Sequence, residues 1–195
     1  MSYFILLLCW AIFYFSHSYL ASLKIKRNIH RLMGKGYKWY RFFYSTLFLI
    51  LFLGIFLYAA IIPAVLLFTP SGGMQYIALM LSGIGTILLI KAFKYFRPLQ
   101  FFGLPPHNDL LEDQKLIIKG IHRHLRHPIY LGLIFIFLGY FLFLPSIGSL
   151  IHLVSLLVYL PIGIYFEEKK LITIFGSAYL DYRKKVPALI PKFTK

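Results

Sequence analysis

Long apolar runs alternate with short, basic polar stretches along this chain. The first three runs cover residues 3–23, 42–62 and 75–90, and the third extends towards residue 96. A transmembrane helix needs about 20 predominantly apolar residues, so each run is close to spanning length. Proline and glycine in the segment 63–73 mark a turn between the second run and the third. We therefore predict three membrane spans within residues 1–96.

The second half of the chain has shorter apolar runs at residues 129–144 and 149–166, with a break at 145–148. Two short spans joined by so tight a turn predict a helical hairpin. The tail has apolar positions near helical spacing, which predicts an amphipathic cytoplasmic helix that continues from the last span and ends before Pro187. The fold class expected from these patterns is an all-α, polytopic transmembrane helical bundle of about five spans. It forms one integral membrane domain over residues 1–195.

Composition agrees with a membrane protein: 59% of the residues are hydrophobic, 14% are charged and the mean hydropathy is +0.75. Soluble domains contain about 25% charged residues. The net charge of +15 does not indicate nucleic acid, because the basic residues lie between apolar runs rather than on one face. The expected partner is the lipid bilayer, and the oligomeric state stays open. Small residues at Ser82, Gly83 and Gly85 predict close packing of the third span on another helix.

The basic residues also predict an orientation. All 21 lysines and arginines fall within residues 24–41, which we interpret as a loop, residues 91–126 and residues 169–195. The N-terminus and the turns near residues 69 and 146 carry none. With five spans, the positive-inside rule places the N-terminus outside and the C-terminus in the cytoplasm, with a bacterial inner membrane as the expected location. The first run lacks a basic flank and a cleavage signal, so we expect it to be retained.

Ionisable residues cluster at two places beside the predicted hairpin, in RHPIY at residues 126–130 and at Glu167–Glu168. Ionisable groups at a membrane boundary are costly and mark functional sites. The hairpin brings both places to one cytoplasmic mouth, where Pro128 would begin a helix whose first-turn N–H groups favour a carboxylate. Glu167 could accept hydrogen bonds from an ammonium or from ribose hydroxyls. In the alternative reading, Arg126 and His127 reach lipid headgroups and the glutamates balance neighbouring lysines.

The segments GIHRHLRHPIYLG, at residues 120–132, and EEKKLITIFGSAYLDYRKKVPALIP, at residues 167–191, resemble the isoprenylcysteine carboxyl methyltransferase and phospholipid methyltransferase superfamily. The resemblance implies that residues 97–195 form a half that binds S-adenosyl-L-methionine. His122 stands where the family usually has Tyr. The cofactor contacts predicted in this way, with the second glutamate of the pair included, are Gln114, Leu116, Ile117, His122, His127, Pro128, Ile129, Tyr130, Glu167 and Glu168.

One position departs from part of that superfamily. Gly163 occupies the place where the eukaryotic prenyl-cysteine enzymes have an arginine, one helical turn before the glutamate pair. That arginine is taken to hold the substrate carboxylate. The glycine therefore counts against a prenylated protein as the substrate of this chain.

The N-terminal half has a further resemblance. FSHSYLASLKIKR, at residues 15–27, and WYRFFYS, at residues 39–45, are similar to the start of membrane proteins of the NnrU and methanethiol S-methyltransferase type. The similarity implies that His17 and Arg41 approach the substrate side of the pocket, and we predict catalytic roles for His17, Arg41 and Arg126. His17 could instead be an intramembrane histidine bonded to a neighbouring helix.

These observations predict methyl transfer from S-adenosyl-L-methionine to a small or lipid-like acceptor, a thiol or a carboxylate. Such acceptors need no general base when ionised. Tyr179 and Tyr182 are expected to face the mouth, and Tyr95, Phe101 and Phe102 to line the pocket. No metal site is predicted, because the histidines lack cysteine or carboxylate partners at ligand spacing. Two alternatives keep the fold: an NADPH-dependent membrane sterol-type reductase and a non-catalytic accessory protein of the NnrU type.

Overall fold

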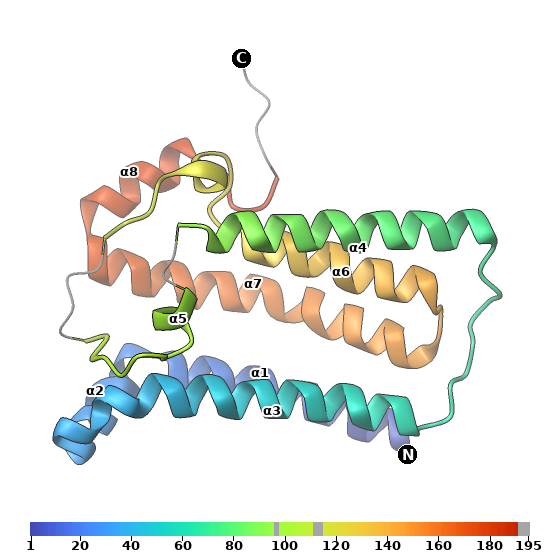
Figure 1. Ribbon diagram of the computed structural model, residues 1–195, viewed down its shortest axis with the longest axis horizontal. Coiled ribbons are helices and arrows are strands. Elements are labelled where there is room, and N and C mark those ends of the chain that lie inside the picture. Colours follow the sequence, from blue (N-terminus) through green and yellow to red (C-terminus); the bar gives the residue numbers. More distant parts are fainter. Residues whose placement is uncertain (96–97, 111–114, 191–195) are drawn as a thin grey trace.

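The computed structural model describes residues 1–95, 98–110 and 115–190. Figure 1 shows the long helices α1, α3, α4, α6 and α7 running side by side, with the N-terminus at one end of the bundle and α2, α5 and α8 at the other. The elements are α1 Ser2–Ala21, α2 Leu23–Met33, η1 Gly34–Trp39, α3 Tyr40–Ile61, α4 Gly72–Phe93, α5 Pro98–Phe101, η2 Gly120–Arg123, α6 Pro128–Phe143, α7 Ile147–Phe175 and α8 Ser177–Lys185.

The predicted all-α membrane bundle is confirmed. Within the described residues, four helical stretches are long and apolar enough to cross a membrane, and α6 is a shorter apolar helix of 16 residues. The hairpin is confirmed as α6 and α7, joined at Pro145 and Ser146. Ser146 caps α7, because its hydroxyl accepts from the Ser149 amide at 3.2 Å and its own amide donates to the Ser149 hydroxyl at 3.0 Å.

The α3–α4 connection is fastened to the hairpin turn. The Leu67 amide donates to the Pro145 carbonyl at 2.8 Å, and the Ile147 amide donates to the Val65 carbonyl at 3.0 Å. These bonds join the N-terminal spans to the hairpin at the end of the bundle opposite α8 (Figure 1). We call the end that carries α2, α5, η2 and α8 the basic end, and the other the opposite end.

Helices α4 and α6 pack closely through small residues. A Cβ atom added to Gly85 of α4 would lie 2.6 Å from the Gly132 carbonyl oxygen of α6, and one added to Gly139 would lie 2.6 Å from the Ala78 carbonyl oxygen. The predicted close approach is confirmed at Ser82 and Gly85, since Ser82 also contacts the Gly139 position. At Gly83 the prediction is wrong, because an added Cβ would meet nothing within 4 Å.

Gly85→Ala is expected to lower the free energy of unfolding by about 2 kcal/mol, because the new methyl group meets rigid backbone on α6. Gly83→Ala lies on the same helix and is the matched control, with unchanged or slightly raised stability. Thermal unfolding of both variants in detergent measures the difference. Equal melting temperatures for the two would contradict the close α4–α6 contact.

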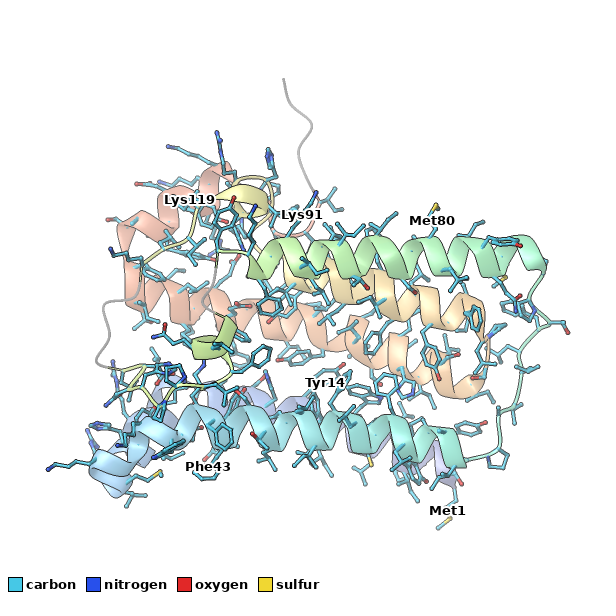
Figure 2. The ribbon with its side chains drawn as sticks, viewed as in Figure 1. Met1, Tyr14, Phe43, Met80, Lys91 and Lys119 are labelled. Carbon is cyan, nitrogen blue, oxygen red and sulfur yellow. The ribbon has the colours of Figure 1, made fainter. Side chains whose placement is uncertain are left out.

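The apolar core lies where α1, α3, α6 and α7 meet. Trp10 of α1 is 1% exposed and packs against Ile55, Phe137 and Leu156 from the other three helices. Figure 2 shows Tyr14 pointing into this interior, whereas Phe43 and Met80 point away from the bundle. Large apolar side chains such as these two stay exposed outside, 61% for Phe43 and 57% for Met80, as expected for a surface that contacts lipid.

At the basic end one prediction is wrong and another holds only in part. Residues 24–41 are not a loop: Ser22 caps α2 by accepting from the Ile25 amide, and η1 then leads directly into α3. The tail is helical and continues from the last span as predicted only as far as Phe175. Helix α7 runs on to Phe175, Gly176 then adopts a φ of 57°, which favours glycine, and α8 starts in a new direction. It ends before Pro187 as predicted.

Candidate functional site

The segment 98–110 folds over the basic end and is anchored by one buried carboxylate. Asp109 accepts a hydrogen bond from the Tyr37 hydroxyl at 2.9 Å and pairs with the Lys26 ammonium and, at 3.5 Å, with the Arg41 guanidinium. Arg41 also donates from Nε to the Phe101 carbonyl at 2.7 Å and lies 4.9 Å from the centroid of the Phe101 ring. This segment is therefore packed onto α2, η1 and α3.

Burial alone would raise the pKa of the Asp109 carboxyl, but Lys26, Tyr37 and Arg41 together hold that pKa below its ordinary value. A carboxyl with a depressed pKa in the folded state stabilises the protein above its ordinary pKa, and this stability is lost as the pH falls through the folded value. Asp109→Asn is expected to cost about 2 kcal/mol at neutral pH, because Lys26 keeps no charged partner there.

Thermal unfolding of wild type and Asp109→Asn between pH 7 and pH 3 tests this prediction. The stability difference between them should shrink towards the acid end, where the wild-type carboxyl becomes protonated. Asp181→Asn is the matched control, because Asp181 is 65% exposed and pairs only with Lys184 among its described contacts. A difference that stays constant over this pH range would contradict the role assigned to the Asp109 charge.

A second cluster fixes the C-terminal tail to the start of α6. Arg126 donates from Nε and Nη2 to Glu168 Oε1, at 2.8 and 2.6 Å, and from Nη1 to the carbonyl oxygens of Arg183 and Val186. Arg183 pairs with the other oxygen of Glu168 at 3.1 Å. The side chains of Arg126 and Glu168 are only 10% and 7% exposed. We call these three side chains the tail clamp.

His127 joins the tail clamp to the neighbouring glutamate. Its Nε2 lies 3.2 Å from Glu168 Oε1, and its Nδ1 lies 3.4 Å from Glu167 Oε2. Tyr130, one turn further along α6, stacks on the His127 ring at a centroid distance of 5.5 Å and interacts electrostatically with Glu167. The hairpin thus brings both predicted motif segments together at the basic end.

Glu167 and Glu168 have different surroundings although they are adjacent. About 43% of the Glu167 side-chain surface is accessible, whereas Glu168 is 7% exposed and is held by Arg126 and Arg183. Both His17 and Lys170 lie close enough to Glu167 to interact with it electrostatically. We call the region between His17, Tyr130, Glu167 and Lys170 the inner chamber.

The N-terminal helices form the other side of the inner chamber. The His17 ring stacks on Phe13 at 6.0 Å and packs edge-on against Phe48 at 4.9 Å. Next to it, the Ser18 hydroxyl lies 2.8 Å from the Tyr159 hydroxyl of α7. Lys170 interacts with Arg41 and with the Lys26–Asp109 pair, which connects the chamber to the anchor of segment 98–110.

The tail contributes two buried tyrosines, as predicted. Tyr182 donates from its hydroxyl to the His122 carbonyl at 2.6 Å, whereas the buried hydroxyl of Tyr179 has no hydrogen-bond partner among the described residues. His122 Nε2 lies 3.2 Å from the Ala92 carbonyl, so this nitrogen is the donor and braces η2 against α4. Burial lowers the pKa of His122, which favours the neutral ring. Leu116 packs on the same tyrosines.

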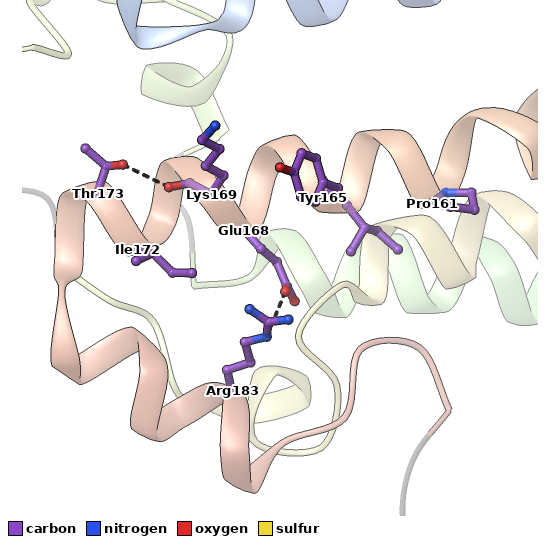
Figure 3. Close-up of a pocket in the computed structure, with 8 residues that line it drawn as sticks. Pro161, Tyr165, Glu168, Lys169, Ile172, Thr173 and Arg183 are labelled. Atoms are coloured by element: carbon purple, nitrogen blue, oxygen red, sulfur yellow. Dashed lines mark hydrogen bonds and ion pairs between the residues drawn. The ribbon is translucent and has the colours of Figure 1, made fainter.

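On its outer face, α7 carries a groove of about 530 Å³ beside the tail clamp. Figure 3 shows Glu168 reaching from α7 to Arg183 of α8 across this groove, with Lys169 and Thr173 on the same helix. The Thr173 hydroxyl donates to the Lys169 carbonyl at 2.9 Å. The groove is therefore separated from the inner chamber by Glu168, whose carboxylate is already fully engaged.

The predicted site residues fall into groups. His127, Pro128, Ile129, Tyr130 and Glu167 meet at the first turn of α6, and His17 lies across the inner chamber from them. Arg126 and Glu168 form the tail clamp, and Arg41 holds segment 98–110. His122, Leu116 and Ile117 lie on the segment that leads to α6, and Gln114 lies outside the described residues.

Sequence reasoning missed Lys26, Asp109, Tyr159 and Lys170, which border or support the chamber. Asp109 is one of only six acidic residues in a strongly basic chain, and that contrast was the available signal. Of the predicted pocket-lining aromatics, Phe101 contacts Arg41, whereas Phe102 is 48% and Tyr95 41% exposed. Across residues 1–95, 98–110 and 115–190, no group of three or more potential ligands could hold a metal ion.

Gly163 faces the chamber side of α7. A Cβ added there would lie 3.0 Å from ring carbons of Tyr159, so this ring fills the space that a larger side chain would need. The position where the prenyl-cysteine enzymes have an arginine is thus closed by a tyrosine that bonds to Ser18.

Comparison with known proteins identifies one protein family and several similar proteins. Residues 5–189 match the family described as NnrU protein. The chain is similar to a methanethiol S-methyltransferase of Crocosphaera subtropica, 29% identical over 60% of this chain and 47% of the relative. One from Pseudomonas deceptionensis is 29% identical over 57% of this chain and 44% of the relative.

A protein-S-isoprenylcysteine O-methyltransferase of Schizosaccharomyces pombe is 36% identical over 41% of this chain and 34% of the relative. The chain spans about half the length of the two methanethiol S-methyltransferases and 34% of the length of the isoprenylcysteine O-methyltransferase. No solved structure gives a significant match. The resemblances predicted from the motif segments are confirmed by these matches.

Proposed function

The chain belongs to the NnrU protein family, and on that premise we propose that it is a membrane methyltransferase that takes its methyl group from S-adenosyl-L-methionine. The observation that carries the proposal is the half-buried, accessible carboxylate of Glu167, set against His127 and Tyr130 at the first turn of α6. The names of the relatives support methyl transfer as the type of reaction.

The residues around the inner chamber fit this cofactor. Its ammonium and ribose hydroxyls are hydrogen-bond donors, for which Glu167 offers an accessible carboxylate. Its carboxylate needs donors, and the unpartnered hydroxyl of Tyr179 and the first-turn N–H groups of α6 supply them. Leu116, Ile117 and Ile129 supply apolar surface beside these groups, and the tail clamp excludes water by holding α8 in place.

When bound, the sulfonium supplies a methyl group for in-line displacement, in which the acceptor forms its bond to the methyl carbon as the sulfur–carbon bond breaks. The chain's part in such a reaction is to position the acceptor and exclude water. His17 borders the chamber opposite Glu167, and a neutral imidazole there can take the proton of a thiol acceptor. We also propose the catalytic roles that the sequence predicts for Arg41 and Arg126. In this structure both guanidinium groups donate hydrogen bonds to backbone carbonyl oxygens.

We propose a small thiol as the preferred acceptor. Tyr159 fills the space next to Gly163, which leaves no cation there for a substrate carboxylate. Two relatives named methanethiol S-methyltransferase support the same class. The inner chamber lies towards the basic end, and the proposed orientation places this end and the cofactor in the cytoplasm, because positive residues remain on that side.

Transfer of labelled methyl groups from S-adenosyl-L-methionine to a panel of small thiols and carboxylates, by protein in detergent, tests the function. We expect thiols to be methylated and His17→Ala to lower kcat by about a hundredfold, with a smaller loss at high pH where the thiol ionises unaided. Ser16→Ala is the matched control, since Ser16 bonds only to backbone carbonyls within α1 among its described contacts. Methylation of carboxylates alone would overturn the thiol assignment.

A further inference from the structure

A second cavity lies near the middle of the bundle, away from the tail clamp. It is an apolar groove of about 710 Å³ between α3, α4 and α6, with Phe52, Phe56, Phe137 and Tyr140 among its walls. Pockets for small organic ligands commonly measure about 300–1,000 Å³ and are lined mainly by apolar and aromatic side chains. We call this cavity the aromatic groove.

A buried histidine lies directly behind its wall. His152 of α7 is 0% exposed, and its ring stacks on Phe56 at a centroid distance of 4.5 Å and an angle of 7°. The Tyr140 ring lies 5.9 Å from it and the Phe137 ring 6.5 Å. All three of these neighbours line the aromatic groove.

The protonation of this histidine follows from its one hydrogen bond. Trp10 donates from its indole nitrogen to His152 Nδ1 at 2.8 Å, so Nδ1 carries no proton. The proton of the neutral ring must therefore be on Nε2. That nitrogen has no hydrogen-bond partner within the described residues. The ring thus holds a buried N–H donor on the edge away from Trp10.

Such a donor is uncommon, because an unsatisfied buried polar group costs free energy that nearly all proteins avoid. Water is a poor partner here, since a bound water needs at least two polar contacts and the surrounding rings are mostly apolar. A hydrogen-bond acceptor on an apolar ligand can pair with His152 Nε2 and, unlike water, needs no second polar contact.

We propose that the aromatic groove binds a membrane-dissolved ring compound bearing a carbonyl oxygen, of the quinone or cyclic ketone class, which accepts a hydrogen bond from His152 Nε2. The flat walls formed by Phe56 and Tyr140 suit a flat ring by stacking. His152 is fully buried and does not itself line the groove, so an aromatic ring of the wall turns aside as the ligand enters. Groove and chamber are distinct, because fifteen residues of α7 separate His152 from Glu167, about 22 Å along the helix.

Trp10 provides a direct readout of binding, because the chain has two tryptophans and the other, Trp39, is 42% exposed in η1. In a Trp39→Phe background, a decyl-substituted benzoquinone added in detergent should quench Trp10 emission with saturation. His152→Asn keeps an acceptor for Trp10 and removes the Nε2 donor, so the apparent affinity should fall about tenfold while the maximal quenching stays similar.

A second variant covers the case in which His152→Asn fails to fold. Leu79→Phe narrows the groove from a position that is 58% exposed and is also expected to weaken quenching. Quenching that rises linearly with quinone, or that is unchanged in a folded His152→Asn protein, would overturn the proposal. A dimer that covers the groove, detected as a doubled protein mass in the detergent complex, would overturn it as well.

Discussion

Replacing Glu167 with glutamine is expected to lower the affinity for S-adenosylhomocysteine by about a hundredfold, with little change in thermal stability. A hydrogen bond to a charged group contributes about 1.5–3 kcal/mol, and the substitution removes the charge that would accept from the cofactor ammonium. Stability changes little because 43% of the side chain is accessible and its described ion pair, with His127 at 3.4 Å, is long. Isothermal titration of both proteins in detergent measures the affinity.

Asp181→Asn is the matched control for the loss of one carboxylate, because it changes the net charge equally on the exposed face of α8. It should leave the affinity as it is in wild type. If Glu167→Gln bound S-adenosylhomocysteine as tightly as wild type, the inner chamber would not hold the cofactor through this carboxylate.

Replacing the adjacent Glu168 with glutamine is expected to have the opposite profile. The free energy of unfolding should fall by about 3–5 kcal/mol, because Arg126 is left as a buried charge without its carboxylate. Arg183 loses the same partner, so α8 should detach at a lower temperature than the rest of the bundle. Limited proteolysis and thermal unfolding in detergent measure these effects.

A double-mutant cycle separates the tail clamp from a general effect of lost charge. Arg126→Gln together with Glu168→Gln should cost clearly less than the two single losses combined, because neither charge is then left alone. Lys184→Gln on the exposed face of α8 should be neutral. Strict additivity of the two single changes would show that the Arg126–Glu168 pair does not join tail and bundle.

The contrast between these two glutamates could not be predicted from the sequence. The sequence motif predicted that both glutamates lie near residues 126–130. The proline signals at Pro128 and Pro145 correctly predicted the hairpin that brings these segments together. Residues adjacent on a helix point about 100° apart, so one carboxylate faces the inner chamber and the other the tail. Which one faces inward depends on where α8 docks, and this docking depends on the turn at Gly176.

The five long helices were predictable, because uninterrupted apolar runs of spanning length have few alternatives in a chain of this composition. Helix α2 was missed because it has only 11 residues and a strongly basic sequence, which favours a loop unless tertiary contacts are known. The contact that decides its position is the Lys26–Asp109 pair, whose members are 83 residues apart. Such long-range pairing leaves no local periodic signal.

Binding of S-adenosylhomocysteine to the purified wild-type protein in detergent, measured by titration calorimetry, tests the central claim most directly. We expect saturable binding of one molecule per chain with a dissociation constant in the micromolar range, not displaced by NADPH. A folded wild-type protein that binds no S-adenosylhomocysteine would contradict the account. Binding of NADPH in its place would assign the inner chamber to a dinucleotide, and binding of neither would favour an accessory role.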